Sequence, residues 1–188
     1  MAHDPARTRA RLLAAAVREF SEHGYAGARI ERISGAAGVN RERLYANFGD
    51  KRRLFEAVLA ERLATALDAT PVRGSGPQAA ADFAADYFDA CLATGDLPRL
   101  VTWEGLELRQ PIEVDERRAR ACRKVEELGA ALPGVGRERL EDLLLTVVTL
   151  CHGWCTGPNL GRIIAGDDAA HERRRAEIAA TARALAAR

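Results

Sequence analysis

A short run of side chains between residues 41 and 47 has the residue types that recognise base pairs. At about 100° per residue, Glu42, Arg43 and Ala46 share the outer face of a predicted helix whose inner face carries Leu44 and Phe48. An arginine can bond the edge of guanine, a glutamate can accept from the amino group of cytosine, and an alanine can touch the methyl group of thymine. These positions predict a helix that reads sequence in the major groove of a DNA duplex.

Neighbouring positions suit the phosphate backbone, whose contacts position a protein without specifying a sequence. Arg41, Tyr45 and Asn47 flank the outer face of the same helix. Lys51 stands in the first turn of the next helix, and a helix N-terminus that carries a lysine is a ready phosphate site. The same residues also fit the solvated face of an ordinary helical hairpin, so the spacing alone leaves both interpretations open.

Two short helices and a tight turn, over about residues 29–48, followed by a capped third helix, must hold these side chains in place. Ile30 and Ile33 lie three apart and therefore share one helix face. Gly38 can adopt the positive φ that a turn between helices needs, and Asn40 is a good N-cap for the second helix. This pattern is typical of a helix-turn-helix.

Helices are expected on both sides of this motif. The preceding helix has a buried stripe of Leu13, Val17 and Phe20 and is expected to end at Gly24. The following helix is capped by Asp50 and runs to about Asp68. Its buried stripe consists of Leu54, Phe55, Val58 and Leu59.

The run from Thr8 to Leu63 resembles the DNA-binding domain of the TetR family of bacterial transcriptional regulators. The matching residues are the amphipathic first helix, Ile33, Ala37, Gly38, Val39, Leu44, Tyr45, Phe48, Lys51 and Leu54. The resemblance implies a homodimer that binds a palindromic operator, usually to repress transcription, and that leaves it when a small molecule enters the C-terminal domain. By family position, it implies DNA contacts at Asn40, Arg41, Arg43, Tyr45, Asn47 and Lys51, with Thr8 and Arg29 at phosphates.

The chain departs from the family pattern at three positions. Ala28 stands where a threonine usually begins the second helix, which predicts the loss of an N-cap and of a phosphate donor. Glu42 stands where glycine is frequent, and its carboxylate is repelled by phosphates unless it reaches a base. Asn47 replaces a common His or Tyr. Operator preferences of relatives are therefore not carried over.

Composition and charge agree with this division of the chain. Residues 1–62 carry 12 Lys and Arg against 8 Asp and Glu, whereas the remainder carries 16 against 19. The basic excess lies with the motif, as an electrostatic footprint on DNA requires. A signal peptide and an apolar run of membrane-spanning length are both missing, so we expect a cytoplasmic protein with its four cysteines reduced.

The remaining chain predicts an all-α fold. We expect a helix-turn-helix domain over residues 1–50, a connecting helix over 50–68, and a helical regulatory and dimerisation domain over 71–188. Residues 71–77, PVRGSGP, are the predicted linker. Further helices are predicted near residues 78–93, 97–109, 113–131, 137–155 and 168–187.

The last two of these helices are the candidates for a dimeric four-helix bundle. Residues 137–155 are apolar on nearly all sides, which predicts a helix buried all round, at a subunit interface or a pocket wall. Ile178, Thr181 and Leu185 share one face of the final helix, among alanines that allow close packing.

A ligand pocket is a second candidate site in the regulatory half. Aromatic side chains with a few polar groups suit an apolar effector, and Glu104 or Glu107 beside Trp103 would suit a cationic one. The same side chains also fit a plain core. The candidate pocket residues are Phe83, Tyr87, Trp103, Glu107, His152 and Trp154.

Cys151, His152 and Cys155 admit three interpretations. The two cysteines share a helix face, where they can be small buried core residues, redox-responsive thiols or an intersubunit pair. A disulfide within one helix at this spacing is awkward, and zinc would need a fourth ligand and a less apolar setting. We therefore predict neither a metal nor any other cofactor.

The sequence favours a ligand-responsive DNA-binding repressor over an enzyme. It has no Gly-rich phosphate loop, no nucleophile elbow and no metal-ligand spacing. The alternative function is a helix-turn-helix scaffold that acts in protein interaction, or as a thiol-redox-responsive regulator through Cys151 and Cys155. Ala28 and Glu42 are the features that favour this alternative.

Overall fold

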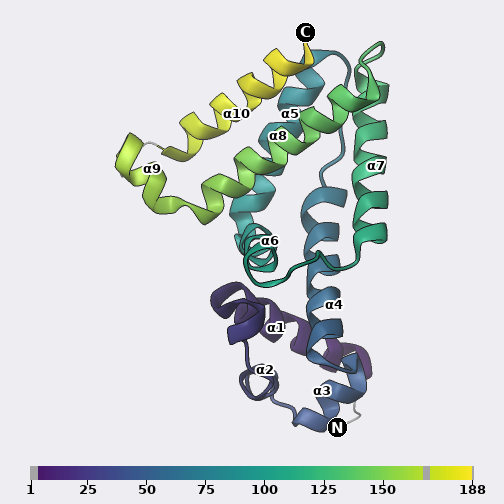
Figure 1. Ribbon diagram of the computed structural model, residues 1–188, viewed down its shortest axis with the longest axis vertical. Coiled ribbons are helices and arrows are strands. Elements are labelled where there is room, and N and C mark those ends of the chain that lie inside the picture. Colours follow the sequence, from purple (N-terminus) through teal and green to yellow (C-terminus); the bar gives the residue numbers. More distant parts are fainter. Residues whose placement is uncertain (1–3, 167–169, 188) are drawn as a thin grey trace. The chain divides into compact units, whose positions relative to one another are not determined.

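A computed structural model describes residues 4–166 and 170–187, and over these residues the chain is helical with no strand (Figure 1). The predicted all-α fold class is confirmed. None of the described helices is both long enough and apolar enough to cross a bilayer. The elements are α1 Pro5–Gly27, α2 Ile30–Ala37, α3 Arg41–Phe48, α4 Lys51–Leu63, the π-helical turn η1 Ala64–Asp68, α5 Pro77–Thr94, α6 Asp96–Glu107, α7 Val114–Ala131, α8 Arg137–Thr156, α9 Pro158–Ala165 and α10 Ala170–Ala186.

The chain divides into two compact units that are not continuous in sequence. The first unit combines the residues up to Leu63 with Arg99–Ile112, and the second combines Ala64–Pro98 with the residues from Glu113 onward. Residues 99–112 lie within the stretch expected for the regulatory domain, yet they pack with the N-terminal helices.

Apolar side chains of α1 to α4 form the core of the first unit. Phe20 lies edge-on to Phe55 with ring centroids 4.9 Å apart, and Tyr25 is 5.4 Å from the same ring. Leu12 is fully buried, whereas the neighbouring Leu13 is only half-buried, so the predicted stripe of α1 was wrong by one residue. The stripe predicted for α4 is confirmed, since all four of its members are buried.

Gly24 bends α1 without ending it. Its φ of 71° and ψ of −179° are non-helical, and one further helical turn follows as far as Gly27. The regular helix ends at Gly24, as predicted, but α1 continues past the bend as far as Gly27. The bend turns the last residues of α1 toward the start of α2.

In the second unit, α5, α8 and α10 lie side by side (Figure 1). Alanines on α5 and α10 allow these two helices a close approach, and Arg175 of α10 bonds Asp89 of α5 at 2.8 Å. Ile178 and Ala182 of α10 are buried but Thr181 is exposed, so the predicted face of this helix was wrong at Thr181.

One side of α8 is uncovered within a single chain, since Leu145 is 64 % exposed; burial of this helix all round, at a subunit interface or pocket wall, stays a prediction. Helix α9 was not predicted, and it exposes Leu160, Ile163 and Ile164. The sequence does not indicate α9 because the segment contains Pro158 and Gly161, residue types that are typical of turns.

Candidate nucleic-acid interface

The turn between α2 and α3 has the geometry predicted for a helix-turn-helix. Gly38 ends α2 in the left-handed conformation, with φ 63° and ψ 40°. The Asn40 side chain accepts the N–H of Arg43 at 2.9 Å and so caps α3. Leu44 and Phe48 are buried on the inner side of α3. The sequence predictions for these four positions are confirmed.

The outer side of α3 presents four exposed residues. Glu42 and Ala46, two of the predicted base-reading positions, are both open to solvent, while Arg43 is half-buried. Arg41 forms an ion pair with Glu31 of α2 at 2.9 Å, and Tyr45 is 38 % exposed. A hydrogen bond with Tyr45 and the charge of Glu31 raise the pKa of Arg41. Together these side chains form a polar surface of the kind that a major groove accepts.

The C-terminal end of α3 is held by Arg9, a residue that was not predicted from the sequence to belong to the site. Arg9 of α1 donates to the Asn47 carbonyl oxygen at 3.3 Å, and its guanidinium lies 4.3 Å from the centre of the Phe48 ring. The Asn47 side chain folds back and donates to the Arg43 carbonyl oxygen at 2.7 Å. Arg9 is therefore an additional candidate for a phosphate contact, and Asn47 has a partner within its own helix.

Two predicted phosphate contacts already have partners within the first unit. The Lys51 ammonium donates to the carbonyl oxygens of Ala28, at 2.7 Å, and Ala26, at 3.3 Å, and burial lowers its pKa. Thr8 is buried, and its hydroxyl donates to the Asp4 carbonyl oxygen at 3.2 Å. Arg29, the third residue predicted beside phosphates in this region, is exposed.

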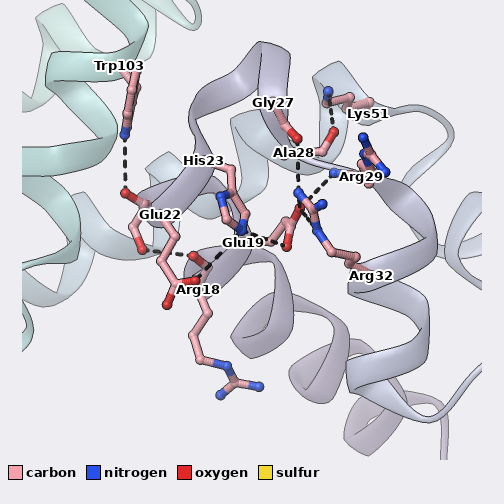
Figure 2. Close-up of polar contacts among 11 residues, drawn as sticks. Arg18, Glu19, Glu22, His23, Gly27, Ala28, Arg29, Arg32, Lys51 and Trp103 are labelled. Atoms are coloured by element: carbon pink, nitrogen blue, oxygen red, sulfur yellow. Dashed lines mark hydrogen bonds and ion pairs between the residues drawn. The ribbon is translucent and has the colours of Figure 1, made fainter.

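The start of α2 differs from the sequence interpretation. Arg29, not Ala28, occupies the N-cap position, and its side chain does not cap the helix. The Arg29 N–H instead donates to the Glu19 carboxylate of α1 at 2.8 Å, whereas Ala28 is buried (Figure 2). Residue 28 therefore lies outside the N-cap position, and its alanine removes no side-chain cap from this helix.

Helix α6 supports the end of α1 within the first unit. The Ser21 carbonyl oxygen accepts from Arg99 Nε at 2.9 Å and from Trp103 Nε1 at 3.2 Å. Glu107 accepts the N–H of Ala26 at 2.9 Å. Trp103 and Glu107, both proposed from the sequence as pocket residues, thus make contacts with α1.

The six predicted pocket residues are divided between the two units. Trp103 and Glu107 belong to the first unit, while Phe83, Tyr87 and His152 form a packed cluster in the second. The Tyr87 hydroxyl lies 2.8 Å from His152 Nε2, and burial lowers the pKa of His152 to about 4. Glu104 is buried and accepts the N–H of Ile112 at 2.9 Å.

Trp154 lies apart from that cluster, beside a surface hollow of about 390 Å³. The ring of Trp154 faces the guanidinium of Arg174, 5.8 Å from the ring centre. The hollow is lined by Leu150, Trp154, Leu160, Ile164, Arg173 and Arg174, among others.

Three cysteines of the second unit, Cys91, Cys151 and Cys155, are poorly placed for thiolate chemistry. Burial raises the pKa of Cys91 to about 12 and also raises the pKa of Cys151 and of Cys155. Since the thiolate is the reactive form, these groups react slowly at neutral pH. Within the described ranges, no three His, Cys, Asp or Glu side chains are placed to hold a metal ion.

Comparison with known proteins agrees with this geometry. Residues 12–58 match the family described as "Bacterial regulatory proteins, tetR family", and residues 80–184 match "Tetracyclin repressor-like, C-terminal domain". The chain is a helix-turn-helix transcriptional regulator. It belongs to the TetR family, as the resemblance of its N-terminal third predicted. The members of this family are regulators of transcription and not enzymes.

One relative and one solved structure cover nearly the whole chain, and a second relative covers about a quarter of it. The HTH-type transcriptional repressor SCO4008 of Streptomyces coelicolor is 35% identical over 173 residues, which is 88% of this chain and 87% of that protein. The transcriptional repressor NicS of Pseudomonas putida is 49% identical over 53 residues, 28% of this chain and 25% of that one. The crystal structure of the putative transcriptional regulator SCO4942 from Streptomyces coelicolor has a TM-score of 0.76 at 29% identity, covering 95% of this chain and 97% of that one.

Proposed function

We propose that the protein is a repressor that binds a palindromic operator as a homodimer and leaves it when a small molecule binds. The observation that carries the DNA-binding part is the outer face of α3. Glu42, Tyr45 and Ala46 are exposed there, directly opposite the buried pair Leu44 and Phe48. This function places the protein in the cytoplasm, where the DNA is.

The proposed contacts fall into two groups. Glu42, Arg43 and Ala46 read base edges, because they lie on or beside the outer face of α3. The other group binds phosphates and sets the position of the protein on the duplex. The members of this second group are Thr8, Arg9, Arg29, Asn40, Arg41, Tyr45, Asn47 and Lys51.

The proposed domains are the helix-turn-helix domain over residues 1–50, a connection over 50–68, and the regulatory domain over 71–188. Dimerisation through α8 and α10 is supported by the apolar side chains that one chain leaves uncovered nearby. Leu145 of α8 is 64 % exposed, and Ile163 of the adjacent α9 is 81 % exposed. Burying such side chains against a second copy is favourable.

The effector proposed is a small apolar or cationic molecule. The hollow beside Trp154 has a volume within the range that small ligands use, and its apolar walls support an apolar body. Trp154 also offers a ring face to a cation. The deep cluster of Tyr87 and His152 is a second place where a polar group of an effector would find partners.

Selection from random duplex DNA tests the function directly. The full chain is expected to recover a palindrome, with an affinity that falls steeply as salt rises because phosphate contacts release counterions. Recovery of no sequence at low salt would overturn the repressor proposal. A complex that persists in every salt concentration would contradict the predicted phosphate contacts.

A further inference from the structure

The N-terminus of α2 is capped by a residue of another helix. The first N–H groups of a helix have no partner within it, and a side chain of the N-cap residue normally supplies one. Here the N-cap residue, Arg29, supplies none. The carboxylate of Glu19 in α1, ten residues earlier, accepts the N–H of Arg29 itself at 2.8 Å, a bond that the third helical residue makes in an ordinary capping box.

The same carboxylate holds a second group of α2. Glu19 Oε1 lies 2.7 Å from Nε of Arg32 and 2.5 Å from its terminal nitrogen, and Arg32 also donates to the Gly27 carbonyl oxygen at 3.0 Å (Figure 2). Glu19 is only 9 % exposed. Burial raises the pKa of this carboxyl, but the hydrogen bonds from Arg32 and from the Arg29 N–H outweigh burial and lower it. Glu19 therefore stays ionised at neutral pH.

The turn that leads into α2 is also held on its other side. The Lys51 ammonium of α4 donates to the Ala28 carbonyl oxygen at 2.7 Å, immediately before the residue whose N–H binds Glu19. The peptide groups around residue 28 are thus fixed from α1 and from α4. With the turn fixed, the exposed side chain of Arg29 is held at the start of α2.

A negative charge close to a DNA-binding helix has a cost. Phosphates repel it, so a carboxylate that served no positioning purpose would weaken DNA binding, and its removal would strengthen it. Removing Glu19 therefore weakens DNA binding if the residue has a positioning role, and strengthens DNA binding if the residue only repels phosphates.

We propose that Glu19 is a positioning residue for operator binding, which fixes the N-terminus of α2 and the Arg29 side chain through its contacts with the Arg29 N–H and with Arg32. This inference rests on the proposed function. Glu19 does not touch DNA itself; it acts through the orientation of α2 and, across the glycine turn, of α3.

Three variants test the proposal with a duplex carrying the sequence that the wild-type protein selects from random DNA. Glu19→Leu removes the contacts with the Arg29 N–H and with Arg32 and is expected to weaken binding about tenfold at constant salt, with a shallower salt dependence because the phosphate contact proposed for Arg29 is weakened. Glu19→Gln keeps an acceptor for the Arg29 N–H and is expected to restore most of the affinity. Glu22→Gln removes the same charge from an exposed residue nearby and is expected to bind as tightly as the wild type or slightly more tightly, because it removes only repulsion.

Hydrogen exchange of the Arg29 amide supplies a readout that does not depend on DNA. The amide is expected to exchange faster in Glu19→Leu than in the wild type and to stay protected in Glu19→Gln. Unchanged protection in Glu19→Leu, or DNA binding by Glu19→Leu as tight as that of the wild type or tighter, would overturn the proposal. Failure of the wild type itself to select DNA would instead overturn the proposed function, while the exchange experiment would still decide whether Glu19 caps α2.

Discussion

The carboxylate of Glu107 lies against Gly24 at the bend of α1. A Cβ atom on Gly24 would stand 2.6 Å from Oε1 and 2.9 Å from Oε2 of Glu107, whose Oε2 also accepts the N–H of Ala26. The backbone of Gly24 has φ 71° and ψ −179°, a region that is open to glycine and strained for other residues. The backbone conformation therefore requires glycine here, and the close approach of Glu107 adds a smaller steric cost for any other residue.

Gly24→Ala is expected to destabilise the protein by about 1–3 kcal/mol, mostly through the backbone conformation, because the end of a glutamate side chain can move aside. Gly105→Ala is the matched control in α6, where a Cβ would meet no atom within 4 Å. This control is expected to be neutral or to stabilise by about 0.5–1 kcal/mol, as alanine favours a helix. Urea unfolding measures the free energy of unfolding of both variants, and an equal loss of stability in the two would contradict the strain at Gly24.

The neutral His152 makes stability depend on pH. Its pKa is about 4 in the folded protein, against 6.5 for an ordinary histidine. Between these values the unfolded chain binds a proton that the folded chain does not, so the free energy of unfolding falls as the pH is lowered from 6.5 to 4. The loss for this group is about 3 kcal/mol at most, and it is complete near pH 4.

Urea unfolding of the wild type and of His152→Phe between pH 7.5 and pH 4.5 isolates this contribution, because other titrating groups are common to both proteins. The phenylalanine keeps a ring next to Tyr87 but has no titrating nitrogen. The variant is expected to lose less stability over this interval. An identical pH dependence in the two proteins would show that His152 is not held neutral.

Asn40→Ala is expected to cost about 1 kcal/mol of stability, because the Arg43 N–H loses its cap. Asn40→Ser keeps a side-chain acceptor at this position and is expected to stay close to the wild type. Thermal unfolding distinguishes the two variants. If the serine variant were as unstable as the alanine variant, the cap would not be the reason for the loss.

Arg43 and Tyr45 are expected to contribute differently to DNA binding. Arg43→Ala should relax specificity at one base pair, with a loss of about 1–3 kcal/mol that is confined to the preferred base. Tyr45→Ala should weaken binding to all sequences, because phosphate contacts carry no sequence information. Binding to a panel of single-base operator variants measures both effects. If the two variants lost affinity in the same pattern across the panel, the separate roles of Arg43 and Tyr45 would be contradicted.

Leu145→Asp is expected to shift the protein toward a monomer, since a carboxylate would be buried without a partner at the proposed interface. Leu106→Asp changes an equally apolar side chain, 73 % exposed, on α6, outside the two helices proposed for the dimer. Light scattering at micromolar concentration gives the mass of each variant. Dissociation of both, or of neither, would count against an interface through α8.

The helix-turn-helix could be predicted from the sequence because local rules determine it. Gly38, Asn40 and Leu44 each have a type that their local geometry requires, and the structure agrees at all three. The cap of α2 could not be predicted in this way. Glu19 and Arg29 are ten residues apart on different helices, and only the bend at Gly24 brings them together.

The candidate pocket illustrates the same difference at longer range. Aromatic types alone placed Trp103 with Trp154, but Trp103 donates to a carbonyl oxygen of α1, and Trp154 lines a hollow of the second unit. Residue types predict that a side chain will be buried or will bind. They do not predict which helix it will pack against, because this depends on the path of the whole chain.

The first unit needs residues from two separate stretches of the chain, and this has a consequence for synthesis. Arg99 and Trp103 bind the Ser21 carbonyl oxygen, and Glu107 binds the Ala26 N–H. A nascent chain that has reached only Leu63 contains the complete helix-turn-helix but lacks these supports. The helix-turn-helix is therefore made before the residues that support the end of α1, and the first unit is complete only once Ile112 has been made, some fifty residues after Leu63.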